Sequence, residues 1–254
     1  MHRPDSVQLT IMTQVRDVAS AALNLLFPNR CAGCGRSGSD LCESCLASFT
    51  PVGDHVCPVC SEIHPPDRVG VCPRCARQPR AYRKIASAFR YEGQIRRAIH
   101  ALKYSRKSSL AFPLAESLGA ALPRPSADLV LCAVPLHPQR EAERGFNQSY
   151  LLAEQLASRW NLPMLPKAAL VRLRATERQV GQDYGARQAN MVDAFGADRD
   201  LVAGRAVLLV DDVCTTGSTL HASAQALISA GAQVVDGVTL ARAVGVGQLA
   251  DVRY

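Results

Sequence analysis

The chain has 254 residues, of which 48% are hydrophobic, and 29 Lys and Arg against 22 Asp and Glu give it a formal net charge of +7. This size and composition predict a globular protein with one substantial core and a small accessory module. The positive charge suits phosphorylated ligands or nucleic acid and does not choose between them. Since no stretch approaches about 18 uninterrupted apolar residues, we expect no membrane-spanning helix.

The first 27 residues carry apolar side chains at helical intervals, from Val7 to Leu26. Arg16 and Asp17 interrupt this segment, and no small-residue cleavage site follows a continuous apolar run. We therefore predict an amphipathic helix over residues 1–27 rather than a signal peptide, and a cytoplasmic protein.

Eight of the ten cysteines lie close together near the N-terminus as four CxxC pairs. The pairs are Cys31/Cys34, Cys42/Cys45, Cys57/Cys60 and Cys72/Cys75. Two thiolates separated by two residues can face one ion, and two such pairs complete a tetrahedral zinc site. Without a secretory signal the thiols should stay reduced, which disfavours a disulfide framework and leaves iron–sulfur or redox chemistry as the alternatives.

Two Zn²⁺ ions would use all eight thiolates and leave no open coordination position, so we expect the zinc to be structural. Consecutive pairing of the CxxC units would give two tandem four-cysteine ribbons, whereas alternating pairing would give a cross-brace. The short spacers favour consecutive pairing. The sequence thus predicts a double zinc-ribbon module over residues 28–80.

A basic connector follows, with twelve Lys or Arg between Arg68 and Leu110 and a single acid, Glu92. Residues 85–93 (IASAFRYEG) indicate a strand, and residues 94–104 a helix with one apolar face. The charge run is typical of a solvated basic face. The functional alternative is an anion track beside an active site or a nucleic-acid surface.

Strand and helix patterns alternate in the rest of the chain. Residues 128–134 and 205–210 are short apolar runs typical of buried parallel strands, residues 147–160 are helical, and 233–240 form another strand. This order predicts an open, mostly parallel α/β sheet, in which ligands bind outside the carboxyl ends of the strands. The loops over residues 135–148 and 211–219 should therefore converge on one site.

The most informative stretch is VLLVDDVCTTGST, residues 207–219. Backbone N–H groups at the start of a helix suit a phosphate monoester, and nearby hydroxyls add donors; the residues concerned are Thr215, Thr216, Gly217, Ser218 and Thr219. Asp211 and Asp212 can accept hydrogen bonds from the vicinal hydroxyls of a sugar. Cys132 and Cys214 are interpreted as buried small residues, and the GxxxxGK[ST] spacing of a P-loop is absent.

This stretch resembles the phosphoribosyl pyrophosphate (PRPP) motif of type I phosphoribosyltransferases. Four further segments narrow the resemblance to the ComF family: LLFPNRCAGCG, HALKYSRK, VPLHPQREAERGFNQSYLLAEQLA and RLRATERQVGQDYGARQANMVDAF, with RGFNQS the most specific piece. The resemblance covers the chain from about Leu25 to the C-terminus. It implies a type I phosphoribosyltransferase-like domain, which we place over residues 81–254.

The resemblance also implies roles for individual residues. The loop after the strand at residues 128–134 would bind pyrophosphate through its arginines. The loop residues concerned are His137, Arg140, Arg144, Gly145, Asn147 and Gln148. Lys103 would be a further cation near the pyrophosphate. A flexible hood closing over PRPP would include Arg172, Arg174, Thr176, Gln179, Arg187 and Asn190. Mg²⁺ would accompany PRPP, and His137 receives no catalytic role.

Two functions follow as hypotheses. The first is a PRPP-binding phosphoribosyltransferase-like protein that transfers phosphoribose, with release of pyrophosphate, to an acceptor that the sequence does not identify. The alternative is a factor for DNA uptake that binds single-stranded DNA and DNA-uptake proteins and uses PRPP as a regulatory ligand.

Overall fold

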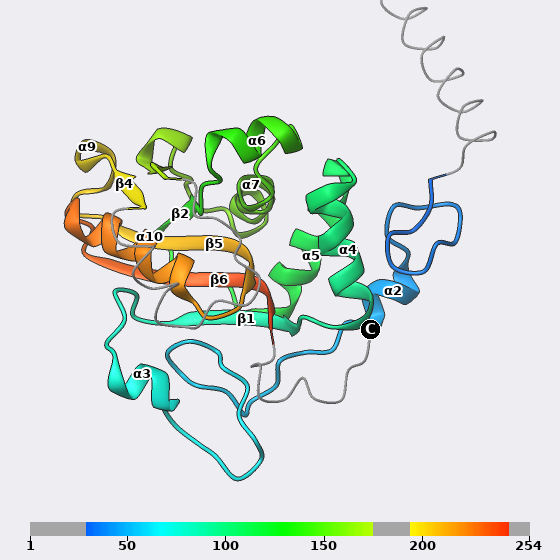
Figure 1. Cartoon of the computed structure of the whole chain (residues 1–254), viewed down its shortest axis with the longest axis horizontal. Helices are drawn as coiled ribbons and strands as arrows, with labels where there is room; N and C mark the ends of the chain where they lie inside the picture. Colours follow the sequence, from blue (N-terminus) through cyan, green and yellow to red (C-terminus); the bar gives the residue numbers. More distant parts are fainter. Residues whose placement is uncertain (1–28, 175–193, 244–254) are drawn as a thin grey trace, which may run out of the picture.

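The computed structural model of the chain describes residues 29–174 and 194–243 (Figure 1). The elements in chain order are α2 (Glu43–Ala47), α3 (Pro73–Arg77), β1 (Ile85–Arg90), α4 (Gly93–Tyr104), η1 (Ser108–Leu110), α5 (Ala111–Ala121), β2 (Leu129–Ala133), α6 (Pro138–Arg144), α7 (Gln148–Trp160), η2 (Lys167–Ala169), β3 (Leu170–Arg172), β4 (Phe195–Ala197), α9 (Arg199–Val202), β5 (Ala206–Cys214), α10 (Ser218–Ser229) and β6 (Val234–Arg242). The helix predicted over residues 1–27 lies outside the described residues.

Four strands form a parallel sheet in the order β1-β6-β5-β2, and β3 and β4 form a separate antiparallel pair. Helices α5 and α7 cover one face of the sheet and α10 covers the other (Figure 1). Strands β2, β5 and β6 are rich in branched apolar residues, because strands covered on both faces bury both sets of side chains. The predicted parallel α/β sheet is confirmed.

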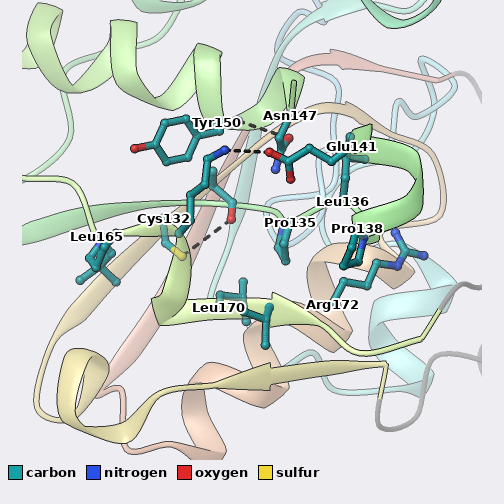
Figure 2. A pocket seen from close by; sticks show the side chains of 14 residues that line it. Cys132, Pro135, Leu136, Pro138, Glu141, Asn147, Tyr150, Leu165, Leu170 and Arg172 are labelled. Carbon is teal, nitrogen blue, oxygen red and sulfur yellow. Dashed lines mark hydrogen bonds and ion pairs between the residues drawn. The ribbon is translucent and has the colours of Figure 1, made fainter. Parts of the chain in front are cut away.

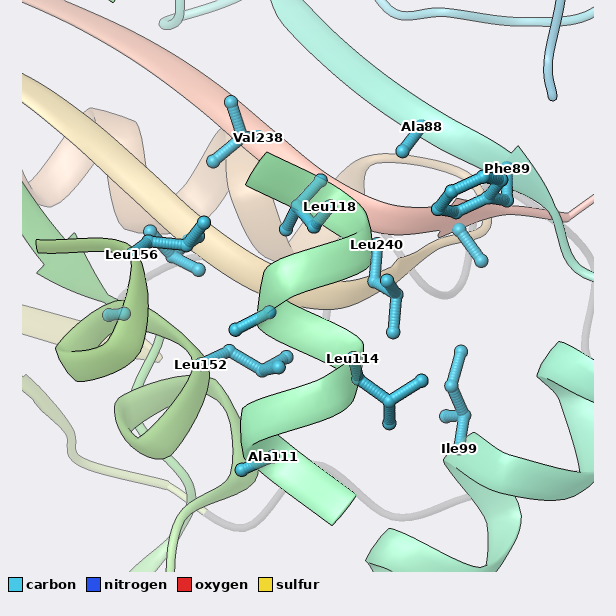
Figure 3. Packing of buried hydrophobic residues seen from close by; sticks show 14 of the residues in the cluster. Ala88, Phe89, Ile99, Ala111, Leu114, Leu118, Leu152, Leu156, Val238 and Leu240 are labelled. Carbon is cyan, nitrogen blue, oxygen red and sulfur yellow. The ribbon is translucent and has the colours of Figure 1, made fainter. Parts of the chain in front are cut away.

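The core consists of two layers, one on each face of the sheet. Leu208 and Val210 of β5 face α5 and α7, whereas Val207 and Leu209 belong to the layer beneath α10. In the first layer, leucines from α5 and α7 interlock with residues from β1 and β6 (Figure 3). A completely buried leucine there, such as Leu114, contributes about 1.5–3 kcal/mol through burial alone.

The cysteine-rich region packs against this domain rather than standing apart from it. Cys31 and Cys45 belong to the core layer of α4, α5 and α7, whereas Cys57 and Cys60 belong to the layer of α10. Between the two cysteine groups the chain runs antiparallel to β1, with Val52 N–H donating to the Ala88 carbonyl at 3.0 Å. The segment covers the free edge of β1, which would otherwise expose unpaired backbone groups. The boundary at residue 80 stays a prediction.

Candidate functional site

The strand β5 extends through both aspartates to Cys214, although the sequence pattern predicted its end at Val210. The extension has a tertiary cause, because β6 pairs Asp211 with Thr239 and Cys214 with Arg242. The two carboxyl groups are therefore fixed on a paired strand instead of a loop. Both are buried, with exposed fractions of 8% for Asp211 and 3% for Asp212.

Asp211 is held by two donors. Its Oδ1 accepts hydrogen bonds from the Ser149 hydroxyl at 2.8 Å and from the Asp212 backbone N–H at 2.9 Å. Burial, together with the neighbouring Asp212 carboxylate, raises the pKa of Asp211 to about 7. Ser149 was not predicted as a residue of this site, and the only signal for it was its place in the RGFNQS segment.

Asp212 forms an ion pair with Lys103, the Oδ1–Nζ distance being 2.8 Å. Burial would lower the pKa of Lys103, but Asp212 and Asp211 outweigh this and raise it, so the ammonium stays charged. The second carboxylate oxygen of Asp212, Oδ2, is buried and has no hydrogen-bond partner among the described residues. An unsatisfied buried carboxylate oxygen is costly and therefore suited to accept a ligand hydroxyl or a metal-bound water.

The loop between β5 and α10 has the geometry of an anion site. Gly217 adopts a left-handed conformation (φ 76°) immediately before Ser218 begins α10. The Thr216 hydroxyl accepts from the Ser218 N–H at 3.3 Å and lies 2.8 Å from the Ser218 hydroxyl. The first N–H groups of a helix have no intrahelical acceptor and carry a partial positive charge, so this loop can bind phosphate. We call residues 215–219 the phosphate loop.

The segment after β2 lies beside this edge of the sheet, as the sequence predicted. His137 caps α6, its Nδ1 accepting from the Gln139 N–H at 3.3 Å, which is a structural role. Gly145 ends α6 in a left-handed conformation (φ 88°), and Asn147 caps α7. The Asn147 amide also donates to the Val134 carbonyl at 3.0 Å, so the RGFNQS segment joins the two helices to the end of β2.

A cationic pocket opens between α4 and α6. It encloses about 260 Å³ and is lined by Lys103, Tyr104, Arg106, Arg140, Glu143 and Arg144. Three of the predicted pyrophosphate ligands, Lys103, Arg140 and Arg144, thus lie together. Since Lys103 also contacts Asp212, the pocket adjoins the aspartate pair.

A second, more apolar cavity of about 160 Å³ lies on the outer side of β2 (Figure 2). Pro135 and Leu136 form one wall and Leu165 and Leu170 another. An ion pair between Lys167 Nζ and Glu141 Oε1, at 2.7 Å, crosses it.

The thiol of Cys132 faces this apolar cavity, and burial raises its pKa to about 12. Cys214 is buried at the end of β5, where its Sγ lies 2.6 Å from Arg242 Nη1. Burial raises the pKa of Cys214 even though Arg242 lowers it. Neither thiol has the lowered pKa of a nucleophile.

The eight N-terminal cysteines form two groups of four, in the consecutive pairing that the short spacers predicted: Cys31, Cys34, Cys42 and Cys45, then Cys57, Cys60, Cys72 and Cys75. Sulfur–sulfur distances within the groups include 3.6 Å and 3.7 Å. Four Zn–S bonds of about 2.3 Å in a tetrahedron place the sulfurs about 3.8 Å apart. The clusters therefore fit zinc, and the closed sets of four thiolates are structural sites.

The hood residues are only partly within the described region. Arg172 lies at the end of β3, its guanidinium 5.4 Å from the centre of the Phe195 ring, and Arg174 follows. Thr176, Gln179, Arg187 and Asn190 lie outside the described residues.

Comparisons with known proteins agree with both parts of the chain. The family model of the double zinc ribbon domain matches residues 22–76, and that of the phosphoribosyl transferase domain matches residues 146–251. The DNA utilization protein YhgH of Escherichia coli is 34% identical over 210 residues, which cover 77% of this chain and 87% of the relative. The chain belongs to the ComF family. Competence protein ComFC of Bacillus subtilis is 27% identical across 89% of this chain and 90% of its own length.

Among solved structures, an adenine phosphoribosyltransferase from Thermoanaerobacter pseudethanolicus is 19% identical, with a TM-score of 0.34 over 54% of this chain and 83% of that chain. The type I phosphoribosyltransferase fold of this ComF protein follows from the family model and from the parallel sheet. In the described part of the chain, no helix has the length and apolarity needed to cross a membrane.

Proposed function

We propose that this ComF-family protein binds PRPP with Mg²⁺ at the carboxyl edge of the sheet and transfers the phosphoribosyl group to an acceptor. The observation that supports this most is the succession of a buried aspartate pair, the phosphate loop and the cationic pocket along one edge. PRPP offers a 5′-phosphate, two vicinal hydroxyls and a pyrophosphate, and these three sets of residues match them in chemistry.

In the proposed complex, the phosphate loop binds the 5′-phosphate through backbone N–H groups and the hydroxyls of Thr216 and Ser218. Asp211 and Asp212 accept hydrogen bonds from the ribose hydroxyls, and the unpartnered Oδ2 of Asp212 supplies one acceptor. Carboxylate oxygens also suit Mg²⁺, which, when bound, would neutralise pyrophosphate charge.

Transfer would break the bond between ribose C1 and pyrophosphate, and the bonding electron pair would leave with pyrophosphate. The lone pair of the acceptor would form the new bond to C1. Because negative charge develops on the leaving group, Lys103, Arg140 and Arg144 would stabilise the transition state from the cationic pocket. Reduced thiols in the zinc clusters are consistent with action in the cytoplasm.

Calorimetry with PRPP and Mg²⁺ tests the binding step. The wild type should release or absorb heat on binding, and Arg140→Gln with Arg144→Gln should weaken binding by at least tenfold, because two charge-assisted contacts are lost. Lys84→Gln is the matched control, since Lys84 lies exposed before β1, at the opposite edge of the sheet. Absence of binding by the wild type, or equal binding by the double variant, would refute the assignment.

Pyrophosphate release from PRPP, measured with bases, ammonia and nucleic acid as acceptors, tests the transfer step. Turnover with one acceptor class supports a transferase. Binding without release in any of these reactions would contradict transfer to them and favour a sensing role for PRPP.

A second candidate function is binding of single-stranded DNA along α4. An open groove there is lined by Arg96, Arg97 and His100 of α4 and by Ala32, which follows Cys31. Relatives are named for competence and DNA utilization. Lys103, which also belongs to the basic connector, pairs with Asp212 and is only 16% exposed, so it is not part of this surface.

Fluorescence anisotropy of a labelled oligonucleotide at two salt concentrations tests this surface. Neutralising Arg96, Arg97 and Arg106 should weaken binding and reduce its salt dependence, because fewer counterions are released. Unchanged affinity in this variant would exclude α4 as the contact surface.

A further inference from the structure

The second cysteine cluster, formed by Cys57, Cys60, Cys72 and Cys75, carries a side chain that touches the phosphate loop. Arg74 lies between the last two of these cysteines, on α3, and its Nη1 donates a hydrogen bond to the Thr216 carbonyl at 3.3 Å. The same nitrogen lies 3.4 Å from Glu62 Oε2. Both Arg74 and Glu62 are partly buried, with side-chain exposed fractions of 27% and 21%.

A second route joins the same cluster to the strand that leads into the loop. Glu62, two residues after Cys60, forms an ion pair with Arg242 at the end of β6. The side chain of Arg242 is completely buried, and its other terminal nitrogen contacts the thiol of Cys214, the last residue of β5. A buried guanidinium needs such partners because an uncompensated charge in the core is strongly unfavourable.

These contacts hold the phosphate loop on the side that faces the second cysteine cluster. Tyr82, three residues before β1, packs against the loop: a Cβ at Gly217 would lie 3.0 Å from its hydroxyl oxygen. The first cysteine cluster contacts a different element: the Gly33 carbonyl accepts a hydrogen bond from Arg97 of α4 at 3.1 Å. The two zinc sites thus support different parts of the domain.

We propose that Glu62, Arg74 and Arg242 are positioning residues for the phosphate loop, so that the folded second cluster sets the affinity of the loop for a phosphate monoester. This inference rests on the proposed function and deepens it, because it makes one of the two zinc sites part of the support of the ligand site. Arg74 holds the carbonyl of Thr216 away from the bound anion, so that the N–H groups of the phosphate loop are directed at the anion.

The test measures binding of two probes by calorimetry, ribose 5-phosphate and inorganic pyrophosphate, each with Mg²⁺. Arg74→Gln should weaken ribose 5-phosphate binding about tenfold, since one charge-assisted hydrogen bond to the loop is lost. Pyrophosphate, which the cationic pocket would bind, should keep its wild-type affinity. Arg74→Lys, which can still donate to the carbonyl, should recover part of the loss.

Arg77→Gln is the matched control. It removes a cation from the same helix, but the Arg77 Nε donates to the Pro73 carbonyl of α3 itself, at 3.1 Å. Its affinity for both probes should equal that of the wild type, and elemental analysis should find two zinc ions in each variant, which excludes loss of the cluster as the cause.

The outcomes distinguish failure of the positioning role from failure of the proposed function. If the wild type binds ribose 5-phosphate and Arg74→Gln binds it equally well, the positioning role is overturned while the proposed function stands. Equal losses for both probes, or a loss in Arg77→Gln, also overturn it, because the effect would then be general. A wild type that binds neither probe overturns the proposed function and this inference with it.

Zinc release provides a second measurement that does not depend on activity. Since the coupling of binding free energies between two sites is reciprocal, ribose 5-phosphate should protect one of the two zinc ions in an equilibrium competition with a chelating dye, so that more dye is needed to remove it. Arg74→Gln should abolish this protection, whereas Arg77→Gln should keep it. Protection that is the same in Arg74→Gln as in the wild type would overturn the coupling.

Discussion

Replacement of Asp211 by asparagine should stabilise the protein at neutral and higher pH. The pKa of this carboxyl is raised to about 7 from its ordinary value of 3.8 by burial and by Asp212, so it carries its proton in the folded state where an unfolded chain has lost it. Its contribution is most favourable below about pH 4 and is lost as the pH rises through 7. Asparagine keeps the oxygen that accepts from Ser149 and from the Asp212 N–H and has no charge to bury.

The size of the effect follows from the two pKa values. Burying Asp211 costs about 4 kcal/mol of unfolding free energy at pH 8, where the buried carboxyl is ionised, and about 2 kcal/mol at pH 5, where it takes up a proton on folding. The gain of Asp211→Asn over the wild type should therefore be larger at pH 8 than at pH 5 by about 2–3 kcal/mol. In a chain of 254 residues this corresponds to a difference of about 5–10 °C in Tm.

Thermal melts of both proteins at pH 5 and pH 8, in buffers containing zinc, provide the measurement. Asp212→Asn is the matched control: it removes the partner of Lys103 and should lower stability at pH 8 by about 3 kcal/mol, because the buried ammonium is left unpaired. A gain for Asp211→Asn that is equal at both pH values, or a loss at pH 8, would show that the Asp211 carboxyl is not held protonated by its surroundings.

Three further results are expected. Gly217→Ala should weaken ribose 5-phosphate binding in calorimetry, because its φ of 76° and a Cβ 3.0 Å from the Tyr82 hydroxyl both disfavour a side chain; equal affinity would argue against a fixed loop. Leu114→Ala should cost about 2–5 kcal/mol of unfolding free energy in urea titrations. Phe112→Ala, on the exposed side of α5, should cost under about 0.5 kcal/mol. Similar costs for the two variants would contradict the packing in Figure 3. Chelation of zinc should lower the Tm, and added Zn²⁺ but not Mg²⁺ should restore it; a Tm insensitive to chelation would refute structural zinc.

The position of Asp211 accounts for a trade between stability and ligand binding. Its carboxylate is repelled by Asp212 and shielded from water, which lowers the stability of the folded protein. A ligand that donates hydrogen bonds to the carboxylate would offset this loss. Asp211→Asn should therefore be more stable and bind ribose 5-phosphate more weakly at pH 8. Strained or charged groups that lower stability are typical of functional sites.

The sequence by itself determined the elements and most of the chemistry. Buried strands are long apolar runs, so the parallel sheet could be read from residues 128–134, 205–210 and 233–240. The CxxC spacing determined the zinc ligands, and short spacers determined their pairing, because local chain geometry decides both. The PRPP motif was equally readable, since Gly217, the hydroxyl residues and the start of α10 are contiguous.

Only the tertiary structure decided how these parts support one another. The strand β5 continues through the aspartates because β6 pairs with it, and no local pattern shows that. Ser149 contacts Asp211 from 62 residues away, Arg242 contacts Cys214 from 28 residues away, and Glu62 contacts Arg242 from 180 residues away. Such contacts depend on the packing of distant segments, which leaves no periodicity in the chain. The same reason hid the division of the cysteine clusters between the two core layers, and with it the contact of Arg74 with the phosphate loop.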